Sequence, residues 1–542
     1  MVTLTPGHHQ SWQGWLALIL FALLTFVPGV ASLPVTDRDE ARFVQTSRQM
    51  VQSGDYIDMR FQDAARHKKP VGIYWLQSAA VHASGQGDHA ALWVYRLVSL
   101  AGALAAVALV VGVGVPLFGR GPALLAAAVF AAGLVIGAEA RIAKTDAALL
   151  ACIMLAQAAL VRLWMQAPVA RGWIYAFWLA MALAVLIKGP IGPMVPALTV
   201  AALTLWDRRM AWLRPLASPG AILVALLVVL PWFVAITLRS DGGFWQASVG
   251  ADLLAKIGSG QEGKGAPPGS YLVMLFFAFW PATPLLILAA PRIWAARRDR
   301  ATAFLLAWAV PVWLVYEAVP TKLLHYTLPV FPALALLSVG HLAAAIRQAP
   351  VWLKAAALLA MLPGLGVAIG VIQVAQAGQG GQVATLLTAA GLCVAVLALA
   401  IAWRMLLRAQ VAGLVLACAT AGAVLHASLF SALAQIPALW PTERAMDFAN
   451  GIAASQDCAK PKITGWGYTE PSLVWRGGRD TRLFDAKTPV ADVIRPGACE
   501  VVVWQTPHPP VPPPPDCRLE GTVTGFAIGA GREVTLHILD CR

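Results

Sequence analysis

The stretch "WQGWLALILFALLTFVPGVASLPVTDRDEARFVQTSRQM", residues 12–50, passes from an almost uncharged apolar run into a cluster of charged residues. An apolar run of about 20 residues has the length that an α-helix needs to cross a membrane. The charged cluster would then lie at the membrane face, where ionisable groups are costly and usually functional. The stretch therefore predicts a membrane protein with a site at one surface.

The composition of the 542-residue chain agrees with this prediction, because 59% of its residues are hydrophobic and only 12% are charged. Soluble domains are roughly 45–50% apolar. The formal net charge of +13 does not indicate a nucleic-acid-binding protein, since the basic residues are spread between apolar segments and form no single basic face. The first apolar segment has no basic region before it, so we expect a retained helix and not a cleaved signal peptide.

Thirteen apolar segments are predicted to cross the membrane, and the loops between them alternate in charge. One set of loops is strongly basic and lies in the cytoplasm under the positive-inside rule. The other set has mixed charge, so we assign it to the outer side, and the N-terminus to the cytoplasm. The predicted spans are 12–33, 90–118, 122–139, 146–166, 172–187, 190–206, 218–238, 270–290, 301–318, 324–344, 351–373, 384–404 and 410–434.

This topology divides the chain into a transmembrane domain at 1–434, with a first outer loop at 34–89, and a small outer α/β domain at 435–542. The expected elements of the outer domain are a capped helix at 440–456, strands at 462–468, 500–504 and 533–541, and a polyproline loop at 507–517.

Four of the seven cysteines lie in the predicted outer domain: Cys458, Cys499, Cys517 and Cys541. An even number of cysteines outside the membrane suggests disulfides and an oxidising compartment. The spacing leaves all three pairings open.

The charged cluster continues into a helix-like pattern in which apolar residues from Phe43 to Val51 recur on one face. This pattern is typical of a helix that lies along the membrane surface. Asp39 and Arg42 are three residues apart and can share a face of it. The alternative interpretation is an interfacial helix whose charges are merely solvated.

A second outer segment, "RHKKPVGIYWLQ" at 66–77, places Lys69 before a proline and an aromatic pair, Tyr74 and Trp75. Basic groups next to interfacial aromatic residues suit an anionic lipid headgroup or a phosphate. An ordinary aromatic belt with basic anchors would have the same pattern.

Two more outer segments carry charges next to apolar spans. The short connection "EARIAKTDAALL" at 139–150 contains Arg141 and Asp146, and Asp146 could also cap the following helix. In "PTKLLHYTLPVFP" at 320–332, Lys322, His325 and Tyr326 enter a span at its outer end, and Lys188 lies at a similar boundary. A single histidine there would usually be a satisfied core group, but four such clusters on one side indicate a site.

Together these segments bring carboxylates and cations to one face of the membrane. Cations can hold a phosphate leaving group as a bond to it breaks, and a carboxylate can remove a proton from an incoming hydroxyl. The pattern therefore predicts group transfer from a lipid-linked donor. The candidate carboxylates are Asp39, Glu40 and Asp146, and the candidate cations are Arg42, Lys69, Arg141, Lys144, Lys188 and Lys322.

The order of the motifs resembles the GT-C membrane glycosyltransferases of the protein mannosyltransferase superfamily, and within it the bacterial ArnT-like branch, the lipid A 4-amino-4-deoxy-L-arabinose transferases. The resemblance covers roughly residues 10–345. The motifs are a D-E pair that opens a surface helix, "SGD", K-P followed by "YW", "RIAKTDA", "KGPIGP" and "KLLHYTLP".

The resemblance implies about thirteen spans, an outer C-terminal domain, and inverting transfer of a sugar from undecaprenyl phosphate. By position it implies that Asp39 is the key aspartate of the first loop, with Glu40 beside it and Asp146 as the aspartate of the second loop. It also implies donor-phosphate ligands and cavity-lining residues. The resemblance implies that Arg42 and Lys69 bind the donor phosphate and that Lys188 and the Lys322–Tyr326 segment line the same cavity. Together with the charge pattern, the predicted phosphate ligands are Arg42, Lys69, Arg141, Lys188 and Lys322, and the predicted cavity residues are Tyr74, His325 and Tyr326.

The chain departs from the family pattern at Lys68 and Val71, where the family often has glutamate and a second proline. A metal site that uses this glutamate is therefore not supported, and we predict no certain cofactor and no metal ligand. The implied partners are a polyprenyl-phosphate sugar donor, lipid A or another glycan or protein acceptor, and the bilayer. We expect a monomer in the bacterial inner membrane.

Two alternatives remain at the level of the sequence. A protein O-mannosyltransferase-like enzyme belongs to the same superfamily and differs only in its acceptor. A secondary transporter or lipid flippase is a different class, but transporters usually place ionisable residues near the midplane of the membrane and contain two related halves. Here the charges lie at one face.

Overall fold

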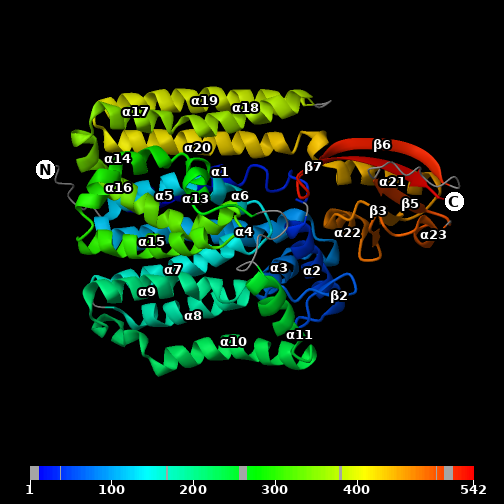
Figure 1. The fold of residues 1–542 in the computed structure, drawn as a ribbon, viewed down its shortest axis with the longest axis horizontal. Coiled ribbons are helices and arrows are strands. Elements are labelled where there is room, and N and C mark those ends of the chain that lie inside the picture. The colour runs from blue at the N-terminus through cyan, green and yellow to red at the C-terminus, as the bar shows by residue number, and fades with distance from the viewer. Residues whose placement is uncertain are drawn as a thin grey trace.

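The computed structural model describes residues 11–36, 38–166, 169–255, 265–377, 381–495, 497–505 and 517–541. Long helices run side by side in one bundle, and a sheet-containing domain lies beyond one end of it (Figure 1). The predicted fold class, a helical membrane protein with a small C-terminal α/β part, is confirmed.

Nine helical segments of the described chain are long and apolar enough to cross a membrane, and four shorter apolar helices overlap the remaining predicted spans. The long segments are α4 (Leu92–Phe118), α7 (Asp146–Trp164), α8 (Arg171–Lys188), α10 (Pro219–Arg239), α15 (Arg300–Ala318), η6 with α16 (Leu324–Val330 and Phe331–Gln348), α17 with α18 (Val351–Leu359 and Leu362–Ala377), α19 (Gln382–Leu407) and α20 (Val411–Leu433). The shorter helices are α1 (Ser11–Phe26), α5 (Arg120–Ala131), α9 (Ile191–Asp207) and α14 (Thr283–Ala295).

Small residues allow the helices of the bundle to approach closely. At Gly102 of α4, an added Cβ would lie 2.7 Å from backbone atoms of Ala147 and Ala148 in α7. Close backbone contact of this kind is a main source of helix association in membranes, where there is no hydrophobic driving force between helices. The contact also fixes the start of α7, where Asp146 lies.

The segment between α1 and α4 folds into two helices, α2 (Asp39–Ser53) and α3 (Gly72–Ser84), with a short hairpin of β1 (Arg60–Phe61) and β2 (Ala64–Ala65) and the turn η2 (Gly87–His89). The sequence predicted a helix along the membrane surface, with an interfacial helix of solvated charges as the alternative interpretation. In the structure α2 is covered on most sides, and polar residues such as Gln45, Ser47 and Gln49 are buried and not solvated. Ser47 Oγ donates to Gln77 of α3 at 2.6 Å, so neighbouring protein takes the place of solvent.

The C-terminal domain is built on a five-stranded sheet in the order β4-β3-β5-β7-β6. Strands β3, β4 and β5 are parallel, and β7 pairs antiparallel with β5 and β6. The predicted helix and three strands are present, whereas β4 and β6 were not predicted, and most of the predicted polyproline loop lies outside the described residues. The elements are α21 (Pro441–Ser455), β3 (Lys462–Trp466), α22 (Pro471–Gly477), β4 (Arg482–Phe484), α23 (Val490–Val493), β5 (Glu500–Gln505), β6 (Arg518–Ala527) and β7 (Arg532–Asp540).

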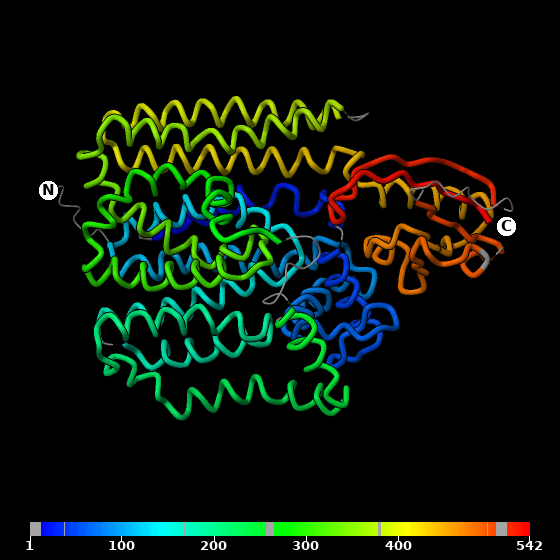
Figure 2. The backbone as a smooth tube through the Cα atoms, in the orientation of Figure 1, coloured from blue at the N-terminus to red at the C-terminus, as the bar shows by residue number. Residues whose placement is uncertain are grey.

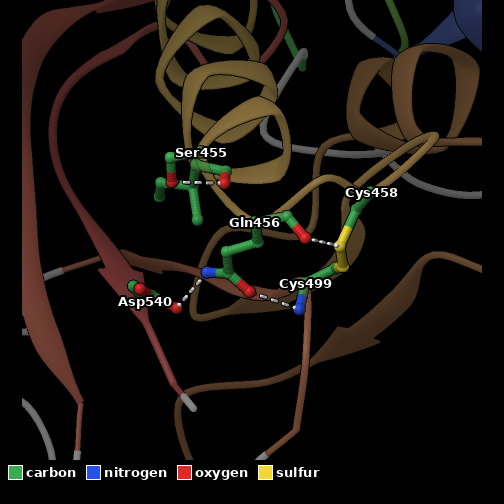
Figure 3. Close-up of a disulfide and its surroundings, with 6 residues drawn as sticks. Ser455, Gln456, Cys458, Cys499 and Asp540 are labelled. Carbon is green, nitrogen blue, oxygen red and sulfur yellow. Dashed lines mark hydrogen bonds between the residues drawn. A yellow bond between two sulfur atoms is a disulfide. The ribbon is translucent and has the colours of Figure 1, made fainter.

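Two disulfides close this domain, Cys458–Cys499 and Cys517–Cys541, which is one of the three pairings that the sequence left open. The first links the segment after α21 to the start of β5. Beside it, Gln456 accepts a hydrogen bond from the backbone N–H of Cys499 and donates one to Asp540 at 3.0 Å (Figure 3). The helix, the central strand and the last strand are therefore joined at one corner.

Candidate active site

The candidate site lies at the end of the bundle that faces the C-terminal domain, where α2 and α3 meet the start of α7 (Figures 1 and 2). The segments that contribute to it are far apart in the sequence. They are α2, the connection between α6 (Leu134–Glu139) and α7, the end of α8, and η6.

Asp39 is the first residue of α2, and its side chain is exposed. A carboxylate at a helix N-terminus is favoured by the helix dipole. Burial by surrounding protein would raise the pKa of Asp39, but the positive charges of Lys144, Arg66 and Arg42 lower it below its usual value. Asp39 is therefore an ionised and accessible carboxylate that can accept a hydrogen bond or a proton from a substrate.

Glu40 has the opposite environment, although it is the next residue. Both of its oxygens accept hydrogen bonds from Arg96, at 2.8 and 2.9 Å. The backbone N–H groups of Ala143 and Thr36 also donate to it. Because the side chain is fully buried and its oxygens are occupied, we correct the predicted catalytic role of Glu40 to a structural one.

A second cluster of alternating charges lies between α6, α7 and η6. Lys144 forms an ion pair with Glu139 at 2.8 Å, and Lys188 forms one with Asp146 at 2.6 Å. His325 lies between the two pairs, with its ring nitrogens 3.8 Å from Glu139 and 3.8 Å from Asp146. The structure therefore brings together four of the predicted residues: Lys144, Asp146, Lys188 and His325.

The charge on Lys144 is maintained by its surroundings. Burial disfavours the charged form, but the carboxylates of Glu139 and Asp146 raise the pKa of Lys144 above its usual value. Lys144 also lowers the pKa of Asp39, so it links the second cluster to α2 electrostatically. A cation in this position can stabilise negative charge that develops in a reaction.

Lys69 lies after the hairpin, and its ammonium group is 2.6 Å from Asp252. Asp252 belongs to η4 (Gln246–Leu254), in the long outer loop that follows α10. Nearby, Arg66 donates to the hydroxyl of the buried Tyr74 at 3.2 Å. The predicted phosphate ligand Lys69 is thus held by a carboxylate from another loop.

Two predicted phosphate ligands point to backbone groups instead. Arg141 is buried and donates to the carbonyl oxygens of Pro28, Gly137 and Thr25. Lys322 is buried and donates to carbonyl oxygens at the end of α15. These contacts tie segments of the bundle together, so we correct both predicted roles to structural ones.

Tyr326, predicted to line the cavity, lies beside the second cluster. Its ring centroid is 5.8 Å from the ammonium of Lys188 and 5.1 Å from the ring of His325. The ring of Tyr326 therefore borders the cluster of Lys188 and His325.

Sequence reasoning missed three residues near the site: Glu139, Arg66 and Asp252. Glu139 and Arg66 belong to segments that were singled out, but nothing in their spacing shows which member of a charged run faces inward. Asp252 lies in a loop whose pairing with Lys69 spans 183 positions, a contact that no local pattern reveals. Within the described residues there is no group of three or more His, Cys, Asp or Glu placed to hold a metal ion.

Comparison with known proteins supports the fold. Residues 11–245 match the family model of dolichyl-phosphate-mannose-protein mannosyltransferases. An undecaprenyl phosphate-alpha-4-amino-4-deoxy-L-arabinose arabinosyl transferase from Edwardsiella ictaluri is 28% identical over 360 residues, which are 65% of this chain and 64% of that protein. One from Pectobacterium carotovorum is 29% identical over 61% of this chain and 60% of that protein. The chain thus spans slightly less than two thirds of the length of these relatives.

Solved structures match the fold of this protein over nearly the whole chain. ArnT from Cupriavidus metallidurans, bound to undecaprenyl phosphate, matches with a TM-score of 0.74 over 97% of this chain and 98% of that chain, at 19% identity. The apo state of the same protein matches with a TM-score of 0.73. The structural match includes the C-terminal domain, which the family model does not reach. The chain therefore has the fold of the ArnT structures over nearly its whole length.

Proposed function

We propose that the protein is an inverting glycosyltransferase that moves a sugar from undecaprenyl phosphate, or a similar polyprenyl phosphate, to lipid A or another envelope acceptor. The observation that carries this proposal is the exposed Asp39 at the start of α2, held ionised by Lys144, Arg66 and Arg42. The names of the relatives, undecaprenyl phosphate-dependent aminoarabinose transferases, support the donor class.

In the proposed reaction, an acceptor hydroxyl attacks the anomeric carbon of the donor sugar and gives its proton to Asp39. The bond between this carbon and the phosphate oxygen breaks, and the electron pair stays on the phosphate. Lys69 and Arg42 bind the phosphate and stabilise its charge. Attack from the face opposite to the leaving group inverts the anomeric carbon.

The second cluster supports this chemistry without taking the proton. Asp146 is paired with Lys188 at 2.6 Å, so its role is to orient the cations and the sugar. Lys144 would stabilise negative charge near Asp39.

The proposed setting is the bacterial inner membrane, with a cytoplasmic N-terminus and the site on the periplasmic side. The disulfides of the C-terminal domain support this orientation, because the periplasm is oxidising. We also propose that the protein acts as a monomer composed of a transmembrane domain, 1–434, and a periplasmic domain, 435–542.

The test uses purified protein in lipid nanodiscs with a polyprenyl-phosphate sugar and lipid A, with products read by mass spectrometry. Asp39→Asn should reduce transfer by about 10²–10⁴-fold, the usual contribution of a general base. Asp447→Asn, on an exposed part of α21, is the matched control and should retain activity. Near-normal transfer by Asp39→Asn would remove the mechanism. Movement of the lipid without a glycosidic product would favour a flippase, and glycosylated protein would favour an O-mannosyltransferase-like enzyme.

A further inference from the structure

The C-terminal domain contacts the helix that carries the proposed base. Helix α22 packs directly against α2, and both views show the domain next to this end of the bundle (Figures 1 and 2). Trp475 of α22 is buried in an apolar cluster with Ala41 and Val44 of α2 and with Ala143. Ala143 precedes Lys144, so this cluster joins Trp475 to both segments that form the site.

Trp475 is held in this position by a cation. The guanidinium carbon of Arg48, on α2, lies 3.5 Å from the centroid of the indole ring, and Arg48 also donates to the carbonyl oxygen of Trp475 at 2.9 Å. A stacked arginine that also forms a hydrogen bond is a directional contact. Tyr95 packs against the same indole edge to face, with centroids 5.6 Å apart.

A second contact reaches the residue directly before Asp39. Arg38 lies 3.8 Å from Glu470, which precedes α22. Arg38 has a φ of 65°, a conformation that is unfavourable for a residue with a side chain and needs support from its surroundings. Burial raises the pKa of Glu470, while the charges of Arg38 and Arg42 oppose this rise. Glu470 therefore also interacts electrostatically with Arg42.

A third set of contacts joins the β1–β2 hairpin to the C-terminal domain. Gln62 donates to the carbonyl oxygens of Arg479 and Thr481 in the C-terminal domain, and Arg479 forms an ion pair with Asp63. On its other side, α2 is joined to the bundle by the Glu40–Arg96 pair. Helix α2 is therefore clamped between the bundle and the C-terminal domain.

We propose that the C-terminal domain is a positioning element of the transfer site, with Trp475 and Glu470 as its positioning residues. They set the place of Asp39 and Arg42 relative to Lys144 and the donor. This inference rests on the proposed function. Displacement of a catalytic group by about 1 Å can reduce a rate by about 10²-fold, so a contact that touches no substrate can control turnover.

The kinetic test compares Trp475→Ala and Trp475→Phe in the full-length protein in nanodiscs. For Trp475→Ala we expect kcat to fall by roughly 10–100-fold, with a smaller change in the KM for the donor, because the base acts mainly in the transition state. Trp475→Phe keeps an aromatic surface for Arg48 and should recover most of the activity. Phe526→Ala is the matched control, since Phe526 is a partly exposed aromatic residue of β6 in the same domain. Equal kcat in Trp475→Ala and the control would overturn the proposal.

A readout that does not depend on turnover is hydrogen exchange of the backbone amides of 39–53. Exchange should be faster in Trp475→Ala than in the wild type, Trp475→Phe and Phe526→Ala, and the change should be confined to α2 and the 140–145 connection. Uniformly faster exchange over the whole chain would mean a general loss of stability and would overturn the positioning role. If Trp475→Ala does not fold, Glu470→Gln tests the positioning role in its place. For Glu470→Gln we expect kcat to fall by a few fold and hydrogen exchange to be faster near Arg38.

The kinetic and hydrogen-exchange experiments distinguish failure of the proposed function from failure of the positioning proposal. If the wild type transfers no sugar from a polyprenyl-phosphate donor, the proposed function fails, and hydrogen exchange still decides whether the C-terminal domain positions α2. If the wild type transfers sugar and both variants retain wild-type kcat and exchange, only the positioning proposal fails.

Discussion

At the scale of single residues, Asp39 and Glu40 show that neighbouring carboxylates can have opposite roles. Asp39 is exposed and lies near the positive charges of Lys144, Arg66 and Arg42, whereas Glu40 is buried and accepts hydrogen bonds from Arg96 through both oxygens. The sequence pattern singled out both residues. Only their surroundings separate the accessible carboxylate from the structural one.

The Glu40–Arg96 pair makes a prediction about stability and pH. Glu40→Gln leaves a buried arginine without its countercharge, and breaking such a pair typically costs about 3–5 kcal/mol. Thermal unfolding at pH 7 should therefore occur at a clearly lower temperature in Glu40→Gln than in the wild type. Burial by itself would raise the pKa of Glu40. The charge of Arg96 and the hydrogen bonds lower it by more, so the pKa of Glu40 lies below the usual 4.5.

A lowered folded-state pKa means that this stabilisation is fully present above the usual glutamate pKa and is lost as the pH falls through the folded value. The difference in melting temperature between wild type and Glu40→Gln should therefore shrink below a pH of about 4.5. A difference that stays constant down to pH 3 would contradict this assignment.

The Lys69–Asp252 pair also concerns single side chains. Asp252 forms an ion pair with the ammonium group of Lys69, which we assign to the donor phosphate. The carboxylate of Asp252 and the phosphate therefore compete for this ammonium group. Asp252→Asn should lower the KM for the donor by several fold, the effect of an ion pair of about 1 kcal/mol. Donor titration of the transfer rate measures it, with Asp241→Asn, an exposed aspartate of the same loop, as the control. A higher KM in Asp252→Asn would show that Asp252 helps to hold Lys69 for the donor.

At the scale of elements, α2 explains why local pattern is insufficient. Its amphipathic spacing predicted a helix on a membrane surface, but α2 packs against α3, α22 and the β1 strand, and most of its polar side chains are buried. The period of the helix was correct because it depends on the backbone. What covers each face depends on elements that are distant in the sequence.

The packing of α4 against α7 leads to a prediction at this scale. Gly102→Val would force the α7 backbone away, because a Cβ at this position would lie 2.7 Å from it. Displacement of α7 would move Asp146, so both thermal stability and transfer should fall, with overpacking costing about 1–3 kcal/mol. Gly112→Ala, in the same helix, has room for the added carbon and should behave like the wild type. Normal stability of Gly102→Val would show that α4 and α7 can separate without harm.

At the scale of the whole molecule, the site exists because distant parts of the chain converge. Residues from α2, α7, α8 and η6 meet at one end of the bundle, and the C-terminal domain covers α2 from outside (Figure 1). The domain has its own apolar core, which includes Met446, Val503 and Leu536. A domain with its own core can fold as a unit and present α22 to α2.

The disulfides provide a prediction for the whole molecule. The double substitution Cys458→Ser with Cys499→Ser removes a cross-link between residues 41 positions apart. Loss of a native disulfide from a small extracytoplasmic domain typically costs 2–5 kcal/mol, so the domain should be cleaved faster in limited proteolysis, at roughly unchanged stability of the bundle. Cys393→Ser, a free cysteine of α19, is the control. Equal proteolysis of the two variants would contradict a stabilising role.

The sequence by itself determined the membrane class, the order of most spans, the helix and three strands of the C-terminal domain, and the set of charged segments that contains the site. These features depend on hydrophobicity, period and charge, which are local properties of the chain. The tertiary structure alone decided that Glu40 is buried against Arg96, that Arg141 and Lys322 donate to backbone carbonyl oxygens, that Asp252 pairs with Lys69, and that Trp475 stacks on Arg48 of α2. Each of these depends on a contact between distant segments, and the environment of a charged group is set by what the fold places around it.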